Sequence, residues 1–215
     1  MGTVDRKQTA LITGVSRGLG KELALQYAAE GWKVIGTTRS ELEMTDYGRI
    51  RKFASQLKGE PIDLLFCNAG ISGKRGMAPG SFDFDSWEDV LRVNLLGPAA
   101  LAEALLDNVA ASERRIIAMM SSRVGSISES SGMTLPYSTS KAALNMLVKG
   151  LAATLAARKI TVVALSPGWV RTDMGGEGAP LSPEASVRGL RKVLDGLKPA
   201  DSGKFLSHDG SAIPW

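Results

Sequence analysis

The sequence predicts an α/β fold with a doubly wound parallel sheet. Short apolar segments of strand length alternate along the chain with longer segments of helical pattern, an arrangement typical of parallel sheets covered by helices on both faces. Of the 215 residues, 44% are hydrophobic and 22% are charged, as in ordinary globular proteins. Because this length suits one domain, we expect residues 1–215 to form a single domain.

Six apolar segments are expected to form the strands, and five segments between them the helices. The first strand ends at a glycine-rich turn, and Gly31 ends the helix that follows. The expected strands are residues 9–13, 33–38, 62–67, 115–120, 161–165 and 203–206. The expected helices are residues 21–30, 47–57, 86–109, 137–157 and 183–197.

The connection after the second strand is too short to return to the sheet. Only residues 40–43 separate that strand from Met44-Thr45-Asp46, which resembles a helix N-cap. A parallel crossover needs about a dozen or more residues. We therefore expect the sheet to end at the second strand on that side.

Three glycines follow the first strand directly. Gly14, Gly18 and Gly20 come after Thr13, and a helical pattern begins beside them. Glycine permits a tight turn, and the first N–H groups of the helix then face a phosphate. The spacing differs from the Gly-x-Gly-x-x-Gly dinucleotide pattern, so a glycine-rich turn that binds nothing is the alternative at this point.

Tyr137 and Lys141 lie four residues apart, on one face of the expected helix 137–157. A lysine ammonium beside a phenol favours the phenolate and lowers its pKa, which suits a general acid or base. The alternative is a half-buried tyrosine beside a surface lysine.

Further polar residues follow the expected strands at one sheet edge. Ser121-Ser122 end the fourth strand, and Asn68-Ala69-Gly70 follow the third. Functional residues often lie at the carboxyl ends of parallel strands, although a serine there can equally satisfy a turn. Asn94 lies inside an expected helix, where it could bend the helix, hold a water or make a structural hydrogen bond.

Composition excludes several classes of function. The net charge is +4, but basic residues occur in no run longer than a pair, so we expect no nucleic-acid partner. One cysteine, Cys67, and one histidine, His208, provide neither an internal disulfide nor a metal site. No signal peptide, myristoylation pattern or membrane-length apolar run is found, and we expect a cytoplasmic protein without a membrane partner.

Taken in order, these motifs resemble the short-chain dehydrogenase/reductase family over nearly the whole chain. The motifs are Thr13-Gly14-x-x-x-Gly18-x-Gly20, Asn68-Ala69-Gly70, Asn94, Ser122, Tyr137-x-x-x-Lys141 and Pro167-Gly168. The ending 209–215 and the segment 167–176 resemble the C-factor and sniffer subgroup. The resemblance implies a Rossmann-like fold and hydride transfer between a nicotinamide cofactor and a carbonyl or alcohol.

The resemblance implies four catalytic residues. Tyr137 would be the general acid in reduction and the base in oxidation, and Ser122, the second of its pair, would orient the substrate oxygen. Lys141 would lower the pKa of Tyr137 and hold the nicotinamide ribose. Asn94 would hold the water of a proton relay through Lys141.

The same resemblance implies the cofactor contacts, with Val170 and Thr172 at the nicotinamide carboxamide. They are Gly14, Ser16, Arg17, Gly18, Leu19, Gly20, Thr38, Arg39, Glu43, Met44, Asn68, Ala69, Gly70, Tyr137, Lys141, Pro167, Gly168, Val170 and Thr172. The chain departs from the family after its second strand, because the family's second helix and third strand are deleted. This deletion predicts the strand order 2-1-4-5-6-7 in the family's numbering, and Glu43 takes the place of the family's adenine-side Asp.

The cofactor expected is NADP(H), with NAD(H) possible. NAD enzymes of this type carry Asp or Glu where this chain has Thr38, and a carboxylate there repels a 2′-phosphate. Arg39 and Arg17 suit a phosphate, although a solvated surface role for Arg39 is the alternative.

The substrate expected is a small-molecule carbonyl or alcohol. Two other functions are open: a cofactor-binding signalling protein with vestigial activity, and an NADP-dependent epimerase or dehydratase. The glycine-rich segment 174–181 suggests mobility on closure. The helix 137–157 is more apolar than one face needs, which predicts a homodimer or homotetramer.

Overall fold

One parallel sheet forms the centre of the computed structural model, which describes residues 6–74 and 76–215. Within these residues, six strands lie in the order β2-β1-β3-β4-β5-β6. The strands are β1 (Thr9–Thr13), β2 (Lys33–Thr37), β3 (Leu64–Cys67), β4 (Ile116–Met120), β5 (Thr161–Ser166) and β6 (Phe205–Ser207). The order confirms the predicted sheet, with β2 at one edge and the family's third strand missing.

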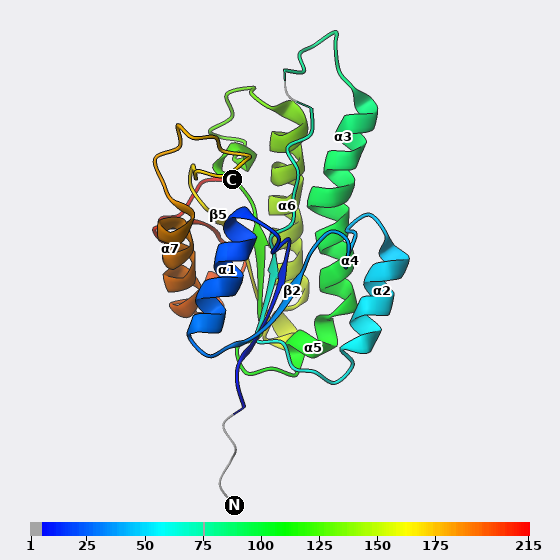
Figure 1. The fold of residues 1–215 in the computed structure, drawn as a ribbon, viewed down its shortest axis with the longest axis vertical. Helices are drawn as coiled ribbons and strands as arrows, with labels where there is room; N and C mark the ends of the chain where they lie inside the picture. The colour runs from blue at the N-terminus through cyan, green and yellow to red at the C-terminus, as the bar shows by residue number, and fades with distance from the viewer. Residues whose placement is uncertain (1–5, 75) are drawn as a thin grey trace, which may run out of the picture.

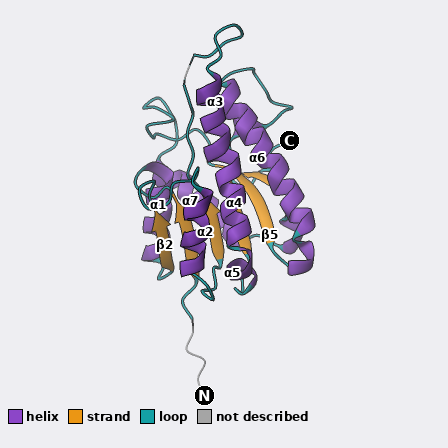
Figure 2. Cartoon of the chain, turned by 90° about the vertical axis from the view of Figure 1, so that its right-hand side faces the viewer, coloured by secondary structure: helices purple, strands orange, loops and turns teal. Residues whose placement is uncertain are grey.

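Helices cover both faces of the sheet (Figures 1 and 2). On one face α1 (Gly18–Ala29) packs beside α7 (Pro183–Asp195), and on the other lie α2 (Tyr47–Gln56), α4 (Gly97–Ala104) and α6 (Leu135–Thr154). Near the ends of the sheet are α3 (Phe84–Leu91), which packs against α6, and α5 (Leu106–Ala110). Single turns of 3-10 helix cover Arg123–Gly125, Ala156–Arg158 and Pro199–Asp201.

Two hydrophobic layers hold the sheet between the helices. Successive residues of a strand point to opposite faces, so Leu11 packs with α2, α4 and α6, whereas Ile12 packs with α1 and α7. Both side chains are fully buried. Burial on both faces explains why the strands read as continuous apolar runs rather than alternating ones.

The helix predicted over 86–109 is interrupted. A π-helical turn, Arg92–Leu96, follows α3 and carries Asn94, and the chain then continues as α4 and α5. The extra residue of such a turn lets a side chain leave the regular helical row, and π turns often mark functional positions.

Three predicted strands begin too early. The third starts at Leu64, and the buried Asp63 carboxylate just before it accepts a hydrogen bond of 2.8 Å from the Thr9 backbone N–H. The fourth and sixth start after Arg115 (φ +52°) and Gly203 (φ +81°), whose left-handed backbone cannot belong to a strand.

The loop after β2 leads directly into α2. Leu42 and Met44 anchor it, with exposed fractions of 2% and 4%. A Cβ on Gly97 would lie only 2.6 Å from the Met44 carbonyl oxygen, so glycine lets α4 approach the loop closely. The backbone that carries the outer, charged side chains of this loop is therefore held in place by buried contacts.

None of the helices in the described part of the chain combines the length and the apolar character needed to cross a membrane.

Candidate active site

The glycine turn between β1 and α1 is closely packed. Gly14 and Gly18 have φ angles of +76° and +55°, which favour glycine. A Cβ on Gly20 would collide with the Gly14 carbonyl oxygen, and one on Gly14 would lie 3.0 Å from the Ala69 Cα. The three glycines therefore let the turn fold against the end of β3.

The first turn of α1 has no side-chain acceptor at its N-terminus. The N-cap residue Arg17 makes no capping hydrogen bond, and no acidic residue lies in the first turn. In contrast, Asp46, Asp83 and Ser182 cap α2, α3 and α7. Backbone N–H groups at this end of α1 are suited to an anionic group such as a pyrophosphate.

Asn68 joins the ends of β1 and β3. Its side-chain amide donates to the Thr13 carbonyl at 2.9 Å, and the backbone N–H groups of Asn68 and Ala69 each donate to the Thr13 hydroxyl at 3.0 Å. Asn68 thus bonds the backbone across the two strand ends, with Thr13 as the acceptor, a role that the sequence did not reveal. Cys67 beside it is buried, and burial raises its pKa to about 12.

Asn94 is fully buried and held on three sides. Its Oδ1 accepts from the Ile71 N–H at 2.9 Å, and its Nδ2 donates to the Ile71 carbonyl at 2.9 Å and to the Ser140 hydroxyl at 3.0 Å. Ser140 in turn donates to the Tyr137 carbonyl at 2.7 Å. The π turn thus ties the segment after β3 to the start of α6, through a serine that the sequence did not single out.

Lys141 is buried beside Asn94. Its Nζ donates to the Met120 carbonyl at 2.7 Å, and the side chain is not on the surface. A Cβ on Gly70 would lie 3.2 Å from Asn94 Oδ1 and 3.6 Å from Lys141 Nζ, so the two polar groups meet over Gly70. Burial lowers the pKa of Lys141 to about 8.

Tyr137 and Ser122 face each other. The Ser122 hydroxyl lies near enough to the Tyr137 phenol to act against a rise in its pKa, and Lys141 Nζ lies 5.4 Å from the centre of the Tyr137 ring. Burial raises the pKa of Tyr137 to about 12, although the Ser122 bond opposes the rise. In the chain alone the net shift is upward because burial outweighs the Ser122 contact, and the lowering of this pKa by Lys141 stays a prediction.

The structure separates the two serines after β4. Ser121 is buried and donates to Asn145 Oδ1 at 2.6 Å, while Asn145 Nδ2 donates to the Gly125 carbonyl at 3.1 Å. Ser122 is the one that reaches Tyr137. Asn145, which shapes this turn, was not evident from the sequence.

The segment after β5 reaches the glycine turn. A Cβ on Gly18 would lie 3.5 Å from the Thr172 methyl carbon, and the Pro167 carbonyl accepts from the Ser186 hydroxyl at 2.7 Å. Val170 is buried. The Arg171 guanidinium donates to two carbonyl oxygens of the expected mobile segment 174–181, at 3.0 and 2.9 Å, so that segment is braced.

The two arginines that were expected to bind the 2′-phosphate each form an ion pair with a carboxylate. Arg39 Nε lies 2.6 Å from Glu43 Oε2, and Arg17 lies 3.3 Å from Asp173. Both arginine side chains are largely exposed, at 84% and 80%. The structure places Arg17 and Arg39 on the outer surface, half-buries Glu43 and buries the Met44 side chain, whereas Asn94 and Lys141 lie deeper.

Comparison with known proteins agrees with this geometry. The sequence profile of the short chain dehydrogenase family matches residues 8–47 and 41–180, two parts that meet in the shortened connection after β2. C-signal of Myxococcus xanthus is 39% identical over 167 residues, which cover 77% of this chain and 100% of that protein.

Two solved structures are similar over the whole fold. A short-chain dehydrogenase/reductase from Burkholderia multivorans with bound NADP has a TM-score of 0.88 and 33% identity, covering 98% of this chain and 100% of that one. Carbonyl reductase Sniffer of D. melanogaster has a TM-score of 0.86 and 27% identity, with the same coverage. The expected similarity to the C-factor and sniffer subgroup is confirmed, and the chain belongs to the short-chain dehydrogenase/reductase family.

Proposed function

We propose that this chain is an NADP(H)-dependent oxidoreductase that interconverts a small-molecule carbonyl and its alcohol. One observation carries the proposal: Lys141 Nζ lies 5.4 Å from the centre of the Tyr137 ring, on which Ser122 also acts, while Lys141 and Asn94 both approach Gly70. All four residues lie at the side of the sheet where the strands have their carboxyl ends, and the glycine turn after β1 lies at the same side. The relatives include a structure with bound NADP and a carbonyl reductase, which supports this chemistry.

Proton transfer is the task of Tyr137. When bound, the nicotinamide supplies the hydride in reduction and accepts it in oxidation. The Tyr137 phenol donates its proton to the carbonyl oxygen in reduction, and its phenolate takes the proton back in oxidation. Ser122 binds the same oxygen through its hydroxyl. A pKa near 12 keeps the phenol protonated at neutral pH, which favours reduction.

Lys141 and Asn94 act behind the phenol. Lys141 binds the nicotinamide ribose, and Asn94 holds the water through which Lys141 exchanges protons with solvent. The fixed amide of Asn94 and the approach of both side chains to Gly70 support these roles.

The residues present suit the cofactor. The uncapped first turn of α1, with Ser16 and Leu19 beside the glycines, would hold the phosphates, and Val170 and Thr172 the carboxamide. Thr38, Arg39 and Arg17 would receive the adenosine 2′-phosphate, which makes NADP(H) the preferred cofactor and NAD(H) a weaker one. On this proposal, residues 1–215 form one NAD(P)-binding domain that works in the cytoplasm.

A substrate screen tests the proposed activity. The purified chain is mixed with NADPH and a panel of aldehydes, ketones and quinones, and the loss of NADPH absorbance is followed. We expect turnover with at least one small carbonyl and slower turnover with NADH. If no carbonyl or alcohol is converted in either direction, the oxidoreductase proposal is wrong.

A regulatory cofactor-binding protein is the second candidate. The similarity to C-signal and the exposed adenosine side favour it. Replacing Tyr137 by Phe separates the two functions, because it removes proton transfer without removing the cofactor site. A cellular phenotype that survives this replacement, after reductase activity is gone, supports the regulatory candidate.

We further propose that the chain forms a homodimer or homotetramer through α4 and α6. An apolar groove runs between these helices and is lined by Leu96, Ala99, Leu106, Leu147 and Leu151. Leu96 is 46% exposed in the single chain. Sedimentation that shows only monomer at high concentration would contradict this assembly.

A further inference from the structure

The Glu41 carboxylate accepts hydrogen bonds from Thr38, just after the end of β2. Glu41 Oε2 accepts two hydrogen bonds from Thr38, one from the backbone N–H and one from the hydroxyl, each 2.8 Å long. Thr38 is the residue expected to face the adenosine ribose. A charged side chain of this protein thus occupies donors that the sequence assigned to the cofactor.

The fold-back of Glu41 is built into the loop. The backbone N–H groups of Glu41 and Leu42 both donate to the Thr38 carbonyl, at 3.2 and 2.9 Å, which closes a tight turn. Leu42 is buried and anchors this turn in the core. Glu41 itself is exposed, so its carboxylate can leave Thr38 without disturbing the packing. The two Thr38 bonds lower the pKa of Glu41, and the group is therefore charged at neutral pH.

The neighbouring arginines are also paired with carboxylates of this chain. Arg39 pairs with Glu43, and Arg17 pairs with Asp173. Every group expected to receive a 2′-phosphate thus has a carboxylate partner of its own. Arg39 and Arg17 are flexible and exposed, so they can exchange partners easily, whereas the Thr38 backbone N–H cannot move.

We propose that Glu41 sets the cofactor preference of this chain by standing in for the 2′-phosphate on Thr38. The carboxylate must leave Thr38 before a 2′-phosphate can bind there, because two anions on the same donors repel each other. With NAD(H) the carboxylate remains in place and accepts a hydrogen bond from the ribose 2′-hydroxyl. This inference rests on the proposed binding of a nicotinamide cofactor.

The test compares binding constants rather than turnover. Isothermal titration measures the Kd of NADPH, NADH and 2′,5′-ADP, which carries the 2′-phosphate without nicotinamide. Glu41→Gln keeps an acceptor oxygen near Thr38 but removes the charge. We expect the Kd of NADPH and of 2′,5′-ADP to fall about tenfold, since one like charge is removed at contact distance, while the Kd of NADH does not fall.

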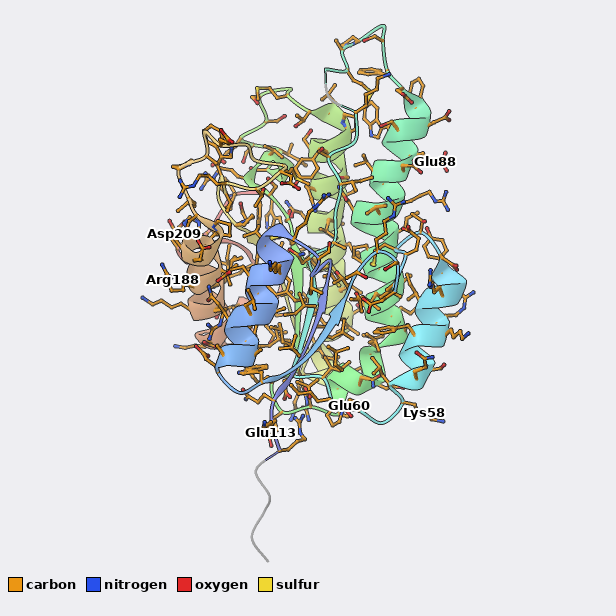
Figure 3. The ribbon with its side chains drawn as sticks, in the orientation of Figure 1. Lys58, Glu60, Glu88, Glu113, Arg188 and Asp209 are labelled. Atoms are coloured by element: carbon orange, nitrogen blue, oxygen red, sulfur yellow. The ribbon has the colours of Figure 1, made fainter. Side chains whose placement is uncertain are left out.

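Glu60→Gln is the matched control. Glu60 forms an ion pair with Lys33 at the start of β2, and Figure 3 shows it at the opposite end of the molecule from the loops above the sheet. The same loss of charge there should leave all three constants unchanged. Equal tightening by Glu41→Gln and Glu60→Gln would show only a general effect of net charge and would overturn the proposal.

The outcomes separate this inference from the proposed function. If wild type prefers NADPH and Glu41→Gln does not change the ratio of the two cofactor constants, the role of Glu41 is wrong and the NADP(H) proposal stands. If wild type prefers NADH and Glu41→Gln shifts the ratio toward NADPH, Glu41 has the proposed role and the expected NADP(H) preference is wrong. If neither cofactor binds, both proposals fail.

Discussion

The two ends of the candidate cofactor site are built by different means. At the catalytic end, Asn94 and Lys141 are buried and held by hydrogen bonds to backbone carbonyl and amide groups. At the adenosine end, the exposed Arg39 forms an ion pair with the half-buried Glu43 on the loop after β2. Buried hydrogen bonds fix geometry, whereas exposed ion pairs are weak and change partners easily. The catalytic candidates are therefore held in fixed positions, whereas the charged side chains at the adenosine end can change partners.

The deleted strand explains the contrast. Without a strand beyond β2, the chain forms a loop over residues 38–46. In this loop Glu41 accepts a hydrogen bond from Thr38, and Glu43 pairs with Arg39. The catalytic candidates follow β3 and β4, which lie two and three strands from β2, and the Asn94, Lys141 and Ser121 hydrogen bonds involve no residue of the loop after β2. Substitutions at the two ends should therefore have separable effects.

The largest expected effect is on the pH dependence of stability at the buried end. Burial lowers the pKa of Lys141 from 10.5 to about 8, so the unfolded chain binds more protons than the folded chain between these pH values. Stability contributed by this residue therefore rises with pH across that window, by about 3 kcal/mol in total. Urea unfolding of wild type and Lys141→Met at both ends of the window measures the difference.

Wild type should gain stability relative to Lys141→Met as the pH rises. Lys52→Met, which removes an exposed lysine on α2, serves as the control and should show no such window. Parallel curves for wild type and Lys141→Met would mean that Lys141 is not desolvated, and the contrast between the two ends would lose its main support.

The next effect compares two buried asparagines. Asn94→Ala leaves the Ile71 amide and carbonyl without their partner, and Asn108→Ala does the same to the carbonyls of Leu57 and Glu60. Each should cost about 2 kcal/mol of stability, because buried polar groups lose hydrogen bonds. Only Asn94→Ala should also lower kcat. If both variants lower kcat alike, the loss follows from stability and Asn94 has no positioning role.

A smaller effect is expected at the adenosine end. Arg39→Ala should weaken NADPH binding about tenfold by removing one guanidinium partner of the 2′-phosphate, and should leave NADH binding nearly unchanged. The Kd values from isothermal titration provide the measurement. Equal weakening of both cofactors would mean that Arg39 does not bind the 2′-phosphate. It would then contact a group that NADPH and NADH share, or only brace the loop through its ion pair with Glu43.

The smallest effect is that of salt. Raising the ionic strength should weaken NADPH binding by roughly threefold, since exposed charges are screened, and should leave kcat at saturating cofactor unchanged. NADH binding should respond less, because it lacks the 2′-phosphate. A kcat that falls with salt as steeply as the affinity does would contradict the separation of the two ends.

The end of the sheet at β2 followed from one short connection in the sequence. Residues 40–43 were too few for a crossover, and β2 is indeed the edge strand. The ordered motifs also brought Asn94, Ser122, Tyr137 and Lys141 together at one place, as the distances over Gly70 show. The short connection alone predicts where the sheet ends, whereas the strand order and the grouping of these four residues were predicted from the resemblance to the family.

Features that depend on burial or on loop shape were beyond the sequence. The pKa of Tyr137 rises rather than falls because its surroundings exclude water, which no spacing reveals. The π turn at Asn94 depends on a partner in the segment after β3, and Glu41 reaches Thr38 only because Leu42 anchors the turn between them. These contacts are tertiary, so local pattern does not encode them.

Tyr137→Phe tests the central claim most directly, with turnover and NADPH affinity measured on the same preparation. The substitution removes one hydroxyl, the group that Ser122 contacts, and leaves the glycine turn intact. Loss of the general acid should lower kcat for carbonyl reduction by about 10²–10⁴-fold while the Kd of NADPH stays within twofold of wild type. A variant that reduces the same carbonyl at the wild-type rate would contradict the account.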